Sequence, residues 1–285
     1  MKFIFIGGAQ RAGTSLVHSI VCSTRATPPP VAEDGTVRYL AMAYEDTIRR
    51  FEQHAGHFFQ DRDEAARFYR KLILQYLEQV ARRWPDASHL VLKQPLLTPH
   101  FPTLAKLLPK AGFIIAIRDP RDIVASLLEV ADRESAELGT PSARRRPGPF
   151  THHALRFYER PMKAFGLRGG KRAVWIRYEE MVRDPATVAR RLGSFTGIDL
   201  SGYQSGEPWR GWSDGTVDLE ERRKSPYFSP LWGQAVTAER IGAWRSILTE
   251  KEAVVVTRAA KPIMQAFGYG DAGTPAPGTT TGRQE

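Results

Sequence analysis

Short apolar runs that alternate with longer helical patterns constrain the fold of this chain more than any other feature. Apolar runs of this length are typical of strands buried on both faces of a parallel sheet. They are Lys2–Ile6, His89–Leu92, Phe113–Ile117 and Ala173–Arg177. The helical patterns are Gly13–Val21, Asp63–Trp84, Pro120–Ala131, His152–Phe165, Pro185–Thr196, Ala238–Ile247 and Lys251–Phe267. The alternation predicts a three-layer α/β/α fold with a central, mostly parallel sheet, which binds ligands at the carboxyl ends of its strands.

The chain of 285 residues suits one large α/β domain or two small ones, and we expect a single domain over residues 1–270. Residues 271–285 lack large apolar side chains, so we predict a disordered tail there. A second irregular stretch is predicted at Asp132–Phe150, which contains Arg144, Arg145 and Arg146. It is interpreted either as a mobile lid over a site or as a solvated loop.

The composition indicates an anionic partner and excludes several classes of site. The net charge of +10 favours a nucleotide, a polyanion, an acidic lipid or nucleic acid, although a basic protein can also be merely soluble. A single cysteine excludes an intramolecular disulfide and a cysteine-rich zinc site. The longest apolar runs are too short to span a membrane, and no signal-peptide pattern precedes the first strand. We therefore expect a cytoplasmic protein without a transmembrane segment.

The glycine-rich segment after the first strand predicts an anion site. Gly7 and Gly8 permit close backbone approach, and the following helix directs its positive dipole end toward a bound anion. The predicted contacts are Gln10, Arg11, Ala12, Gly13, Thr14 and Ser15. The alternative is a tight β–α turn with ordinary caps. Thr14 stands where the nucleotide-triphosphatase pattern GxxxxGK[ST] has lysine, which weighs against hydrolysis of ATP or GTP.

The third strand ends in a second candidate anion site. Arg118 closes the strand, Asp119 and Pro120 fit the start of a helix, and Ser126 follows eight residues after Arg118. Alone, this pattern is often a capped helix with surface ion pairs. Together with the first loop it predicts a ligand with two separated phosphates, about one nucleotide length apart. Asp119 and Asp122 are the candidate magnesium ligands here, but both stand beside arginines.

Both motifs resemble those of sulfotransferases that use 3′-phosphoadenosine 5′-phosphosulfate (PAPS). The resemblance implies that the first loop holds the 5′-phosphosulfate and that Arg118 and Ser126 hold the 3′-phosphate. "VLKQP" resembles a strand-end segment of the tyrosylprotein branch and implies that Lys93 contacts the sulfuryl region. "IRYEEMVRDP" and "SPLW" resemble later family segments and imply cofactor contacts by Tyr178 and Ser229. The implied fold is P-loop nucleotide-hydrolase-like. The implied product of PAPS is adenosine 3′,5′-bisphosphate, and no metal is required.

The catalytic base departs from that of the cytosolic aryl branch. That branch places a histidine two residues after the equivalent lysine, where this chain has Pro95. In the tyrosylprotein-like and glycan-modifying branches the base is a glutamate, which implies Glu33, with Asp34 second. We expect an in-line displacement at sulfur. Glu33 would take the acceptor proton, while Arg11 and Lys93 stabilise the developing charge.

The acceptor is predicted only as a hydroxyl: a sugar, a lipid, a small alcohol, a phenol or a peptide tyrosine. No specific nucleic acid and no oligomeric state are predicted. Two other classes of protein remain open. An ATP-dependent P-loop kinase predicts magnesium-dependent ATP binding. A non-enzymatic polyanion-binding protein predicts steep salt dependence and indifference to small nucleotides.

Overall fold

The structure, a computed structural model, describes residues 1–137, 139, 146–203, 225, 227–229, 231 and 234–270. Its centre is a four-stranded sheet in the order β2-β1-β3-β4, and every neighbouring pair is parallel. The strands are β1 (Lys2–Gly8), β2 (His89–Lys93), β3 (Gly112–Ile117) and β4 (Ala173–Arg177). The four predicted strands are therefore confirmed. Because the chain passes from β2 across β1 to β3, the strand order reverses beside β1, where such sheets bind ligands.

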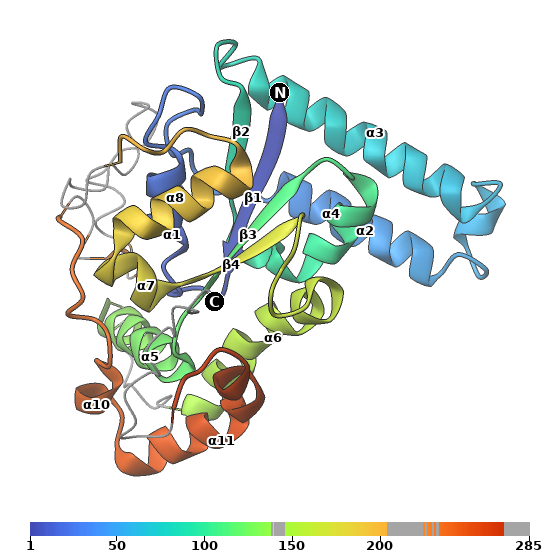
Figure 1. Cartoon of the computed structure of the whole chain (residues 1–285). Helices are drawn as coiled ribbons and strands as arrows, with labels where there is room; N and C mark the ends of the chain where they lie inside the picture. Colours follow the sequence, from blue (N-terminus) through green and yellow to red (C-terminus); the bar gives the residue numbers. More distant parts are fainter. Residues whose placement is uncertain are drawn as a thin grey trace, which may run out of the picture.

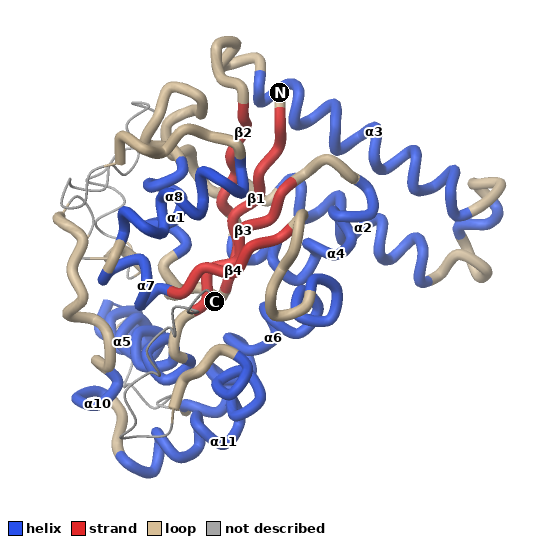
Figure 2. Tube along the Cα trace, in the orientation of Figure 1, coloured by secondary structure: helices blue, strands red, loops and turns tan. Residues whose placement is uncertain are grey.

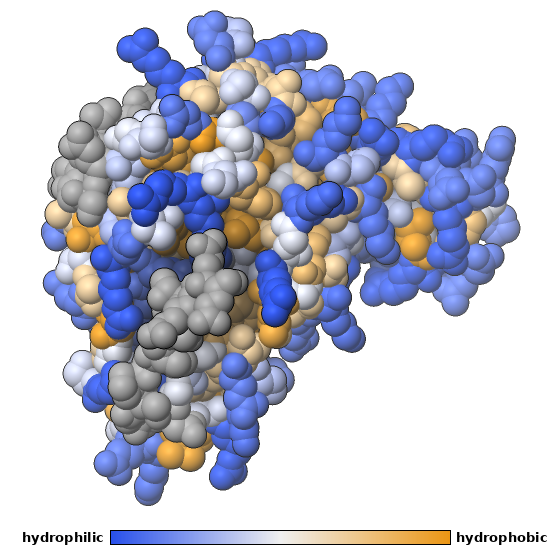
Figure 3. Space-filling view, in the orientation of Figure 1, coloured by the Kyte–Doolittle hydropathy of each residue, from blue (hydrophilic) through white to orange (hydrophobic). Residues whose placement is uncertain are grey.

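Helices cover both faces of the sheet and give the expected three layers (Figure 1). One face carries α1 (Thr14–Val21) and α8 (Pro185–Thr196), which pack against each other. The opposite face carries α2 (Thr36–Arg49), α3 (Arg62–Ala81), α4 (Phe101–Leu107) and α6 (Pro147–Phe165). Helices α2 and α3 form an arm that extends away from the sheet (Figure 2), and hydrophilic side chains dominate its surface in Figure 3.

The remaining elements surround the carboxyl ends of the strands. They are α5 (Pro120–Glu137), α7 (Tyr178–Arg183), α10 (Trp244–Ile247), α11 (Glu250–Ala266) and the 3₁₀ turn η2 (Pro95–His100). A second 3₁₀ turn, η1 (Ala55–His57), lies between α2 and α3 at the tip of the arm. A small apolar cluster joins Val124 and Leu128 of α5 to Trp244 and Val256. The main core is formed by the strands and the helix faces that cover them. No helix within the described ranges is long and apolar enough to cross a membrane.

Two sequence predictions need correction, and some helices were missed. Parts of the stretch Asp132–Phe150 are helical, because α5 continues to Glu137 and α6 begins at Pro147. Proline is tolerated in a first helical turn, so Pro147 starts a helix instead of marking a loop. The predicted helix Ala238–Ile247 is reduced to Trp244–Ile247, because Gly242 has a φ of 73°. Helices α2, α4 and α7 were not predicted. Arg144, Arg145 and residues 271–285 lie outside the described residues.

Candidate functional site

A cavity of about 970 Å³ lies at the carboxyl ends of the strands, and it is lined by the last residue of β2 and by residues that follow β1, β3 and β4. The loop after β1 supplies Gln10, Arg11 and Gly13, and β2 ends in Lys93. Arg118 follows β3, and Tyr178 follows β4. Parallel strands place their carboxyl ends at one edge of a sheet, so four distant segments meet here. A cavity of this volume holds a ligand of nucleotide size.

The loop between β1 and α1 takes a conformation that few side chains permit. Gly8 and Gly13 have φ angles of 134° and 89°. A Cβ on Gly8 would lie 2.3 Å from the carbonyl oxygen of Ala116, and one on Gly13 would lie 2.7 Å from the Tyr178 ring. Arg11 has a φ of 70°, the left-handed region that favours glycine. No side chain caps the first turn of α1 in the described structure, so its amide end is available to an anion.

Neighbouring elements hold this loop from behind. The Gly8 amide donates to Thr98 Oγ1 at 2.7 Å, and the Ala9 amide donates to the hydroxyl of Tyr158 at 3.1 Å. The imidazole Nε2 of His153 lies 2.9 Å from Gln10 Oε1. Sequence reasoning missed these supports, because the partners are more than 80 residues away along the chain.

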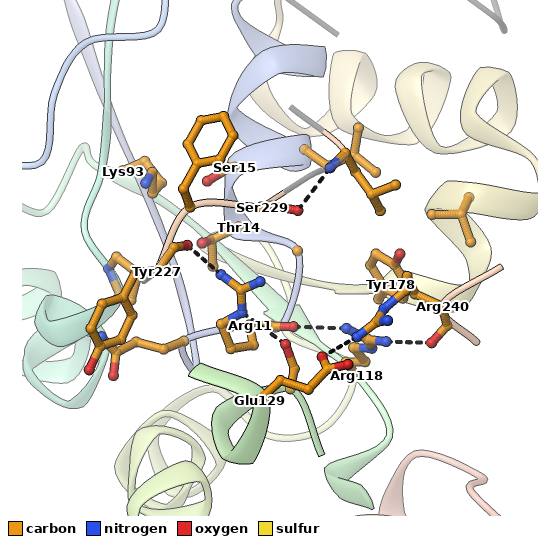
Figure 4. A pocket seen from close by; sticks show the side chains of 18 of the residues that line it. Arg11, Thr14, Ser15, Lys93, Arg118, Glu129, Tyr178, Tyr227, Ser229 and Arg240 are labelled. Carbon is orange, nitrogen blue, oxygen red and sulfur yellow. Dashed lines mark hydrogen bonds and ion pairs between the residues drawn. The ribbon is translucent and has the colours of Figure 1, made fainter. Parts of the chain in front are cut away.

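Arg11 lies at the centre of the cavity (Figure 4). Its Nε donates to Ser126 Oγ at 3.0 Å, and its Nη1 donates to the carbonyl oxygen of Tyr227 at 2.8 Å. Burial, and then the charge of Arg118, lower the pKa of Arg11 to about 10, so the side chain is cationic at neutral pH. The two anion motifs were expected one nucleotide length apart. Here the two motifs are in direct contact, because Arg11 reaches Ser126 and Arg118 donates to the carbonyl oxygen of Arg11 at 3.2 Å.

A second group of cations lies at the other end of the cavity (Figure 4). The Arg118 guanidinium stacks 4.3 Å from the centre of the Tyr178 ring and donates to the carbonyl oxygen of Arg11 at 3.2 Å. Arg240 lines the same end and forms an ion pair with Glu129. Sequence reasoning missed both residues of this pair. Glu129 follows Ser126 by three positions on α5, a spacing that places both on one helix face, whereas Arg240 belongs to an irregular segment.

The predicted base and the predicted sulfuryl-binding lysine form an ion pair. Lys93 Nζ contacts Glu33 Oε1, and both residues line the cavity. Lys93 is only 5% exposed, whereas Glu33 is 39% exposed and reachable from solvent. The second candidate base, Asp34, accepts hydrogen bonds from the Thr36 amide at 2.9 Å and from the hydroxyl of Tyr76. Asp34 therefore fixes the start of α2, and the geometry favours Glu33.

The predicted site residues come together with one exception. Ala12 is fully buried and does not line the cavity; its amide closes the loop by donating to the Ala9 carbonyl oxygen at 3.1 Å. Ser229 lines the cavity, and its hydroxyl accepts from the Leu231 amide at 3.4 Å. The others that line the cavity are Gln10, Arg11, Gly13, Thr14, Ser15, Glu33, Lys93, Arg118, Ser126 and Tyr178.

The two carboxylates after β3 are occupied by protein groups. Arg121 binds Asp119 with two guanidinium nitrogens, at 3.0 and 2.7 Å. Asp122 accepts from the amides of Gly242 and Trp244, at 2.8 and 3.0 Å. Burial raises the pKa of Asp122, against the opposing charge of Arg118. Asp122 thus anchors the segment that carries Arg240 to the start of α5.

Comparisons with known proteins agree with this geometry. A model of the Sulfotransferase family matches residues 4–202. A protein-tyrosine sulfotransferase of Drosophila melanogaster is 24% identical over 242 residues, which are 81% of this chain and 42% of that protein. The chain therefore spans less than half the length of this relative.

Two solved structures share the fold. The sulfotransferase domain from the curacin biosynthetic pathway has a TM-score of 0.59 and 16% identity, and the match covers 92% of this chain and 97% of that one. The sulfotransferase domain from the Synechococcus PCC 7002 olefin synthase has a TM-score of 0.57 and 14% identity, covering 92% and 94%. The predicted P-loop-like sulfotransferase fold is thereby confirmed. Together with the family match, which covers more than half of the chain, these results show that the chain belongs to the sulfotransferase family.

Proposed function

We propose that this protein transfers a sulfuryl group from PAPS to a hydroxyl acceptor. The observation that carries the proposal is the single cavity with cationic groups at both ends, joined by Arg11. One end has Lys93 and the amide end of α1, which suit a phosphosulfate. The other end has Arg118 and Ser126, which suit a 3′-phosphate. Family membership supports the same reaction.

The roles of the residues follow from the charges that change in the reaction. The bound donor supplies the sulfuryl group, whose bond to the 5′-phosphate oxygen is exchanged for a bond to the acceptor oxygen. Glu33 accepts the acceptor proton; a carboxylate has about four lone-pair sites, so pairing with Lys93 leaves room for a proton. Lys93 and Arg11 stabilise the electron pair left on the phosphate oxygen. The burial of Lys93 strengthens its electrostatic interactions relative to water.

A kinase is the less favoured candidate. Asp119 and Asp122 are the carboxylates that would be expected to hold magnesium after β3, and both already accept hydrogen bonds from protein groups. The charge that magnesium supplies in kinases is provided here by arginine and lysine side chains. This arrangement supports a donor that binds without a metal ion.

Ligand-dependent thermal unfolding tests the proposal. Adenosine 3′,5′-bisphosphate without metal should raise Tm, because a ligand of the native state stabilises it. Arg118→Ala should remove most of this shift, whereas Arg70→Ala, a change of an exposed arginine on α3, should leave it intact. Stabilisation by ATP with magnesium but not by the bisphosphate would favour the kinase. Steeply salt-dependent polyanion binding with no response to either nucleotide would favour the polyanion-binding protein.

The finer features of the function belong to the same proposal. We expect one catalytic domain over residues 1–270 and a cytoplasmic location. A tyrosine hydroxyl is the first acceptor to test, because the Drosophila relative is named for protein tyrosine. A screen with labelled PAPS should compare a tyrosine peptide with a sugar, a lipid alcohol, a small alcohol and a simple phenol.

A further inference from the structure

Tyr178 and Glu179 are adjacent in the sequence, but Tyr178 faces the cavity and Glu179 faces the protein interior. Tyr178 stacks under Arg118 and lines the cavity, whereas Glu179 is 5% exposed and is absent from the cavity wall. Glu179 Oε1 accepts the amide of Asp119 at 2.9 Å. That amide belongs to the peptide bond directly after Arg118. Glu179 therefore fixes the backbone of the turn from which the Arg118 side chain enters the cavity.

The other oxygen of Glu179 is bound from the C-terminal end of the described chain. Tyr269 follows α11 and donates its hydroxyl to Glu179 Oε2 at 2.9 Å. Arg177 stacks 4.4 Å from the centre of the Tyr269 ring, and its Nε lies 3.8 Å from the same carboxylate oxygen. Tyr269 is 7% exposed. A buried carboxylate between two donors cannot move without leaving one of them unpaired.

A second route joins the same C-terminal segment to the carboxylate of Asp119. Arg121 holds the Asp119 carboxylate and also donates through Nη2 to the carbonyl oxygen of Gly270 at 3.0 Å. Its guanidinium stacks 4.4 Å from the centre of the Trp244 ring. Residues 269 and 270 thus reach the turn through Glu179 and Arg121, although neither lines the cavity.

We propose that Glu179 and Tyr269 are positioning residues for donor binding, and that they act through Arg118. This inference rests on the proposed function, because it assigns Arg118 to the 3′-phosphate. Side chains that bind a ligand are effective when a surrounding shell holds them in place. Losing the Tyr269 hydroxyl frees one side of the Glu179 carboxylate and loosens the Arg118 turn. Donor affinity falls as a result, while Glu33 and Lys93 keep their geometry.

The test is Tyr269→Phe in the full chain, which removes one hydroxyl and keeps the buried ring. Binding of adenosine 3′,5′-bisphosphate, measured by calorimetry, should weaken about tenfold, as expected for the loss of one buried hydrogen bond. The KM for PAPS should rise by a similar factor, while kcat at saturating PAPS stays near the wild-type value. Tyr69→Phe is the matched control. It removes a hydroxyl that is bonded to Thr47 at 2.9 Å on the α2–α3 arm, and should leave both values unchanged.

Two further variants keep the test decisive. Glu179→Gln can still accept from the Asp119 amide and donate to the Tyr269 oxygen, so it should retain most of the affinity. Arg121→Lys keeps the positive charge but cannot bind the Asp119 carboxylate through two guanidinium nitrogens. It should weaken bisphosphate binding as Tyr269→Phe does. Unchanged bisphosphate affinity in a folded Tyr269→Phe or Arg121→Lys protein would overturn the inference, as would a loss confined to kcat. Failure of the wild-type protein to bind the bisphosphate would instead overturn the proposed function.

Discussion

At the scale of single residues, the contact between Lys93 and Glu33 is the most informative feature. The two residues are 60 positions apart, and each was assigned its role separately from the sequence. Their contact places a carboxylate and a cation on the same wall of the cavity. Such a pair suits a reaction that needs a proton acceptor beside a group that stabilises negative charge.

Glu33→Gln should separate binding from chemistry. The amide is similar in size but cannot take a proton, so turnover should fall by roughly 10²- to 10⁴-fold, the range for general-base catalysis. Affinity for adenosine 3′,5′-bisphosphate should stay within about twofold, because the Arg118 end is untouched. Steady-state turnover with labelled PAPS and calorimetric binding measure the two effects. The control is Glu52→Gln, which changes a carboxylate in an exposed ion pair with Arg62 and should leave turnover unchanged. Full turnover in Glu33→Gln would show that another group is the base.

At the scale of elements, α5 connects the site to the C-terminal part of the chain. Ser126, Glu129 and Arg133 line the cavity, at a spacing that keeps them on one helix face. Val124 and Leu128 pack instead with Trp244 and the start of α11. Helix α5 therefore supplies one wall of the cavity with one face, and with its other face the apolar surface against which α10 and α11 pack.

A second contact region between elements is centred on Glu45. This residue belongs to α2, and its carboxylate contacts residues of η2, α4 and α6. Its carboxylate accepts from His100 at 3.0 Å, from Arg160 at 2.7 and 3.1 Å, and from the hydroxyl of Thr103. Burial is the largest single influence and would raise the pKa of Glu45. The hydrogen bonds from His100, Arg160 and Thr103 together outweigh it and lower the pKa to about 2.

Glu45→Gln should therefore have a pH-dependent effect on stability. A carboxylate whose pKa is lowered by folding stabilises the protein above its unfolded pKa of 4.5 and loses that contribution as the pH falls toward 2. At pH 7 the substitution should lower the free energy of unfolding by about 1 kcal/mol, a discounted value because the site is partly exposed. The difference from wild type should narrow between pH 4.5 and pH 2 in urea unfolding. A difference in the free energy of unfolding that stays constant across that range would contradict a lowered pKa of Glu45. The control is Glu78→Gln, at an exposed position of α3.

At the scale of the whole molecule, the sequence predicted the features that depend on strand ends. Parallel strands bring their carboxyl ends to one edge, so motifs at Arg11, Lys93, Arg118 and Tyr178 had to converge. Features that depend on packing were missed. Helix α2 was also missed, although Val37, Leu40, Ala41, Tyr44 and Ile48 recur at helical spacing and pack against the core. Arg240 and Tyr227 reach the cavity from irregular segments that have no periodicity to detect.

The backbone of Arg11 has a consequence for the stability of the whole protein. A residue other than glycine held at a φ of 70° costs roughly 1 kcal/mol or more, and burying this guanidinium beside Arg118 adds to that cost. Asparagine accepts this backbone conformation and carries no charge. Arg11→Asn should therefore raise Tm by a few degrees in the absence of ligand while abolishing sulfuryl transfer, and a lower Tm would contradict this account. Selection for thermal tolerance alone would then remove a residue to which we assign a catalytic role, so activity has to be screened at every round of stabilisation.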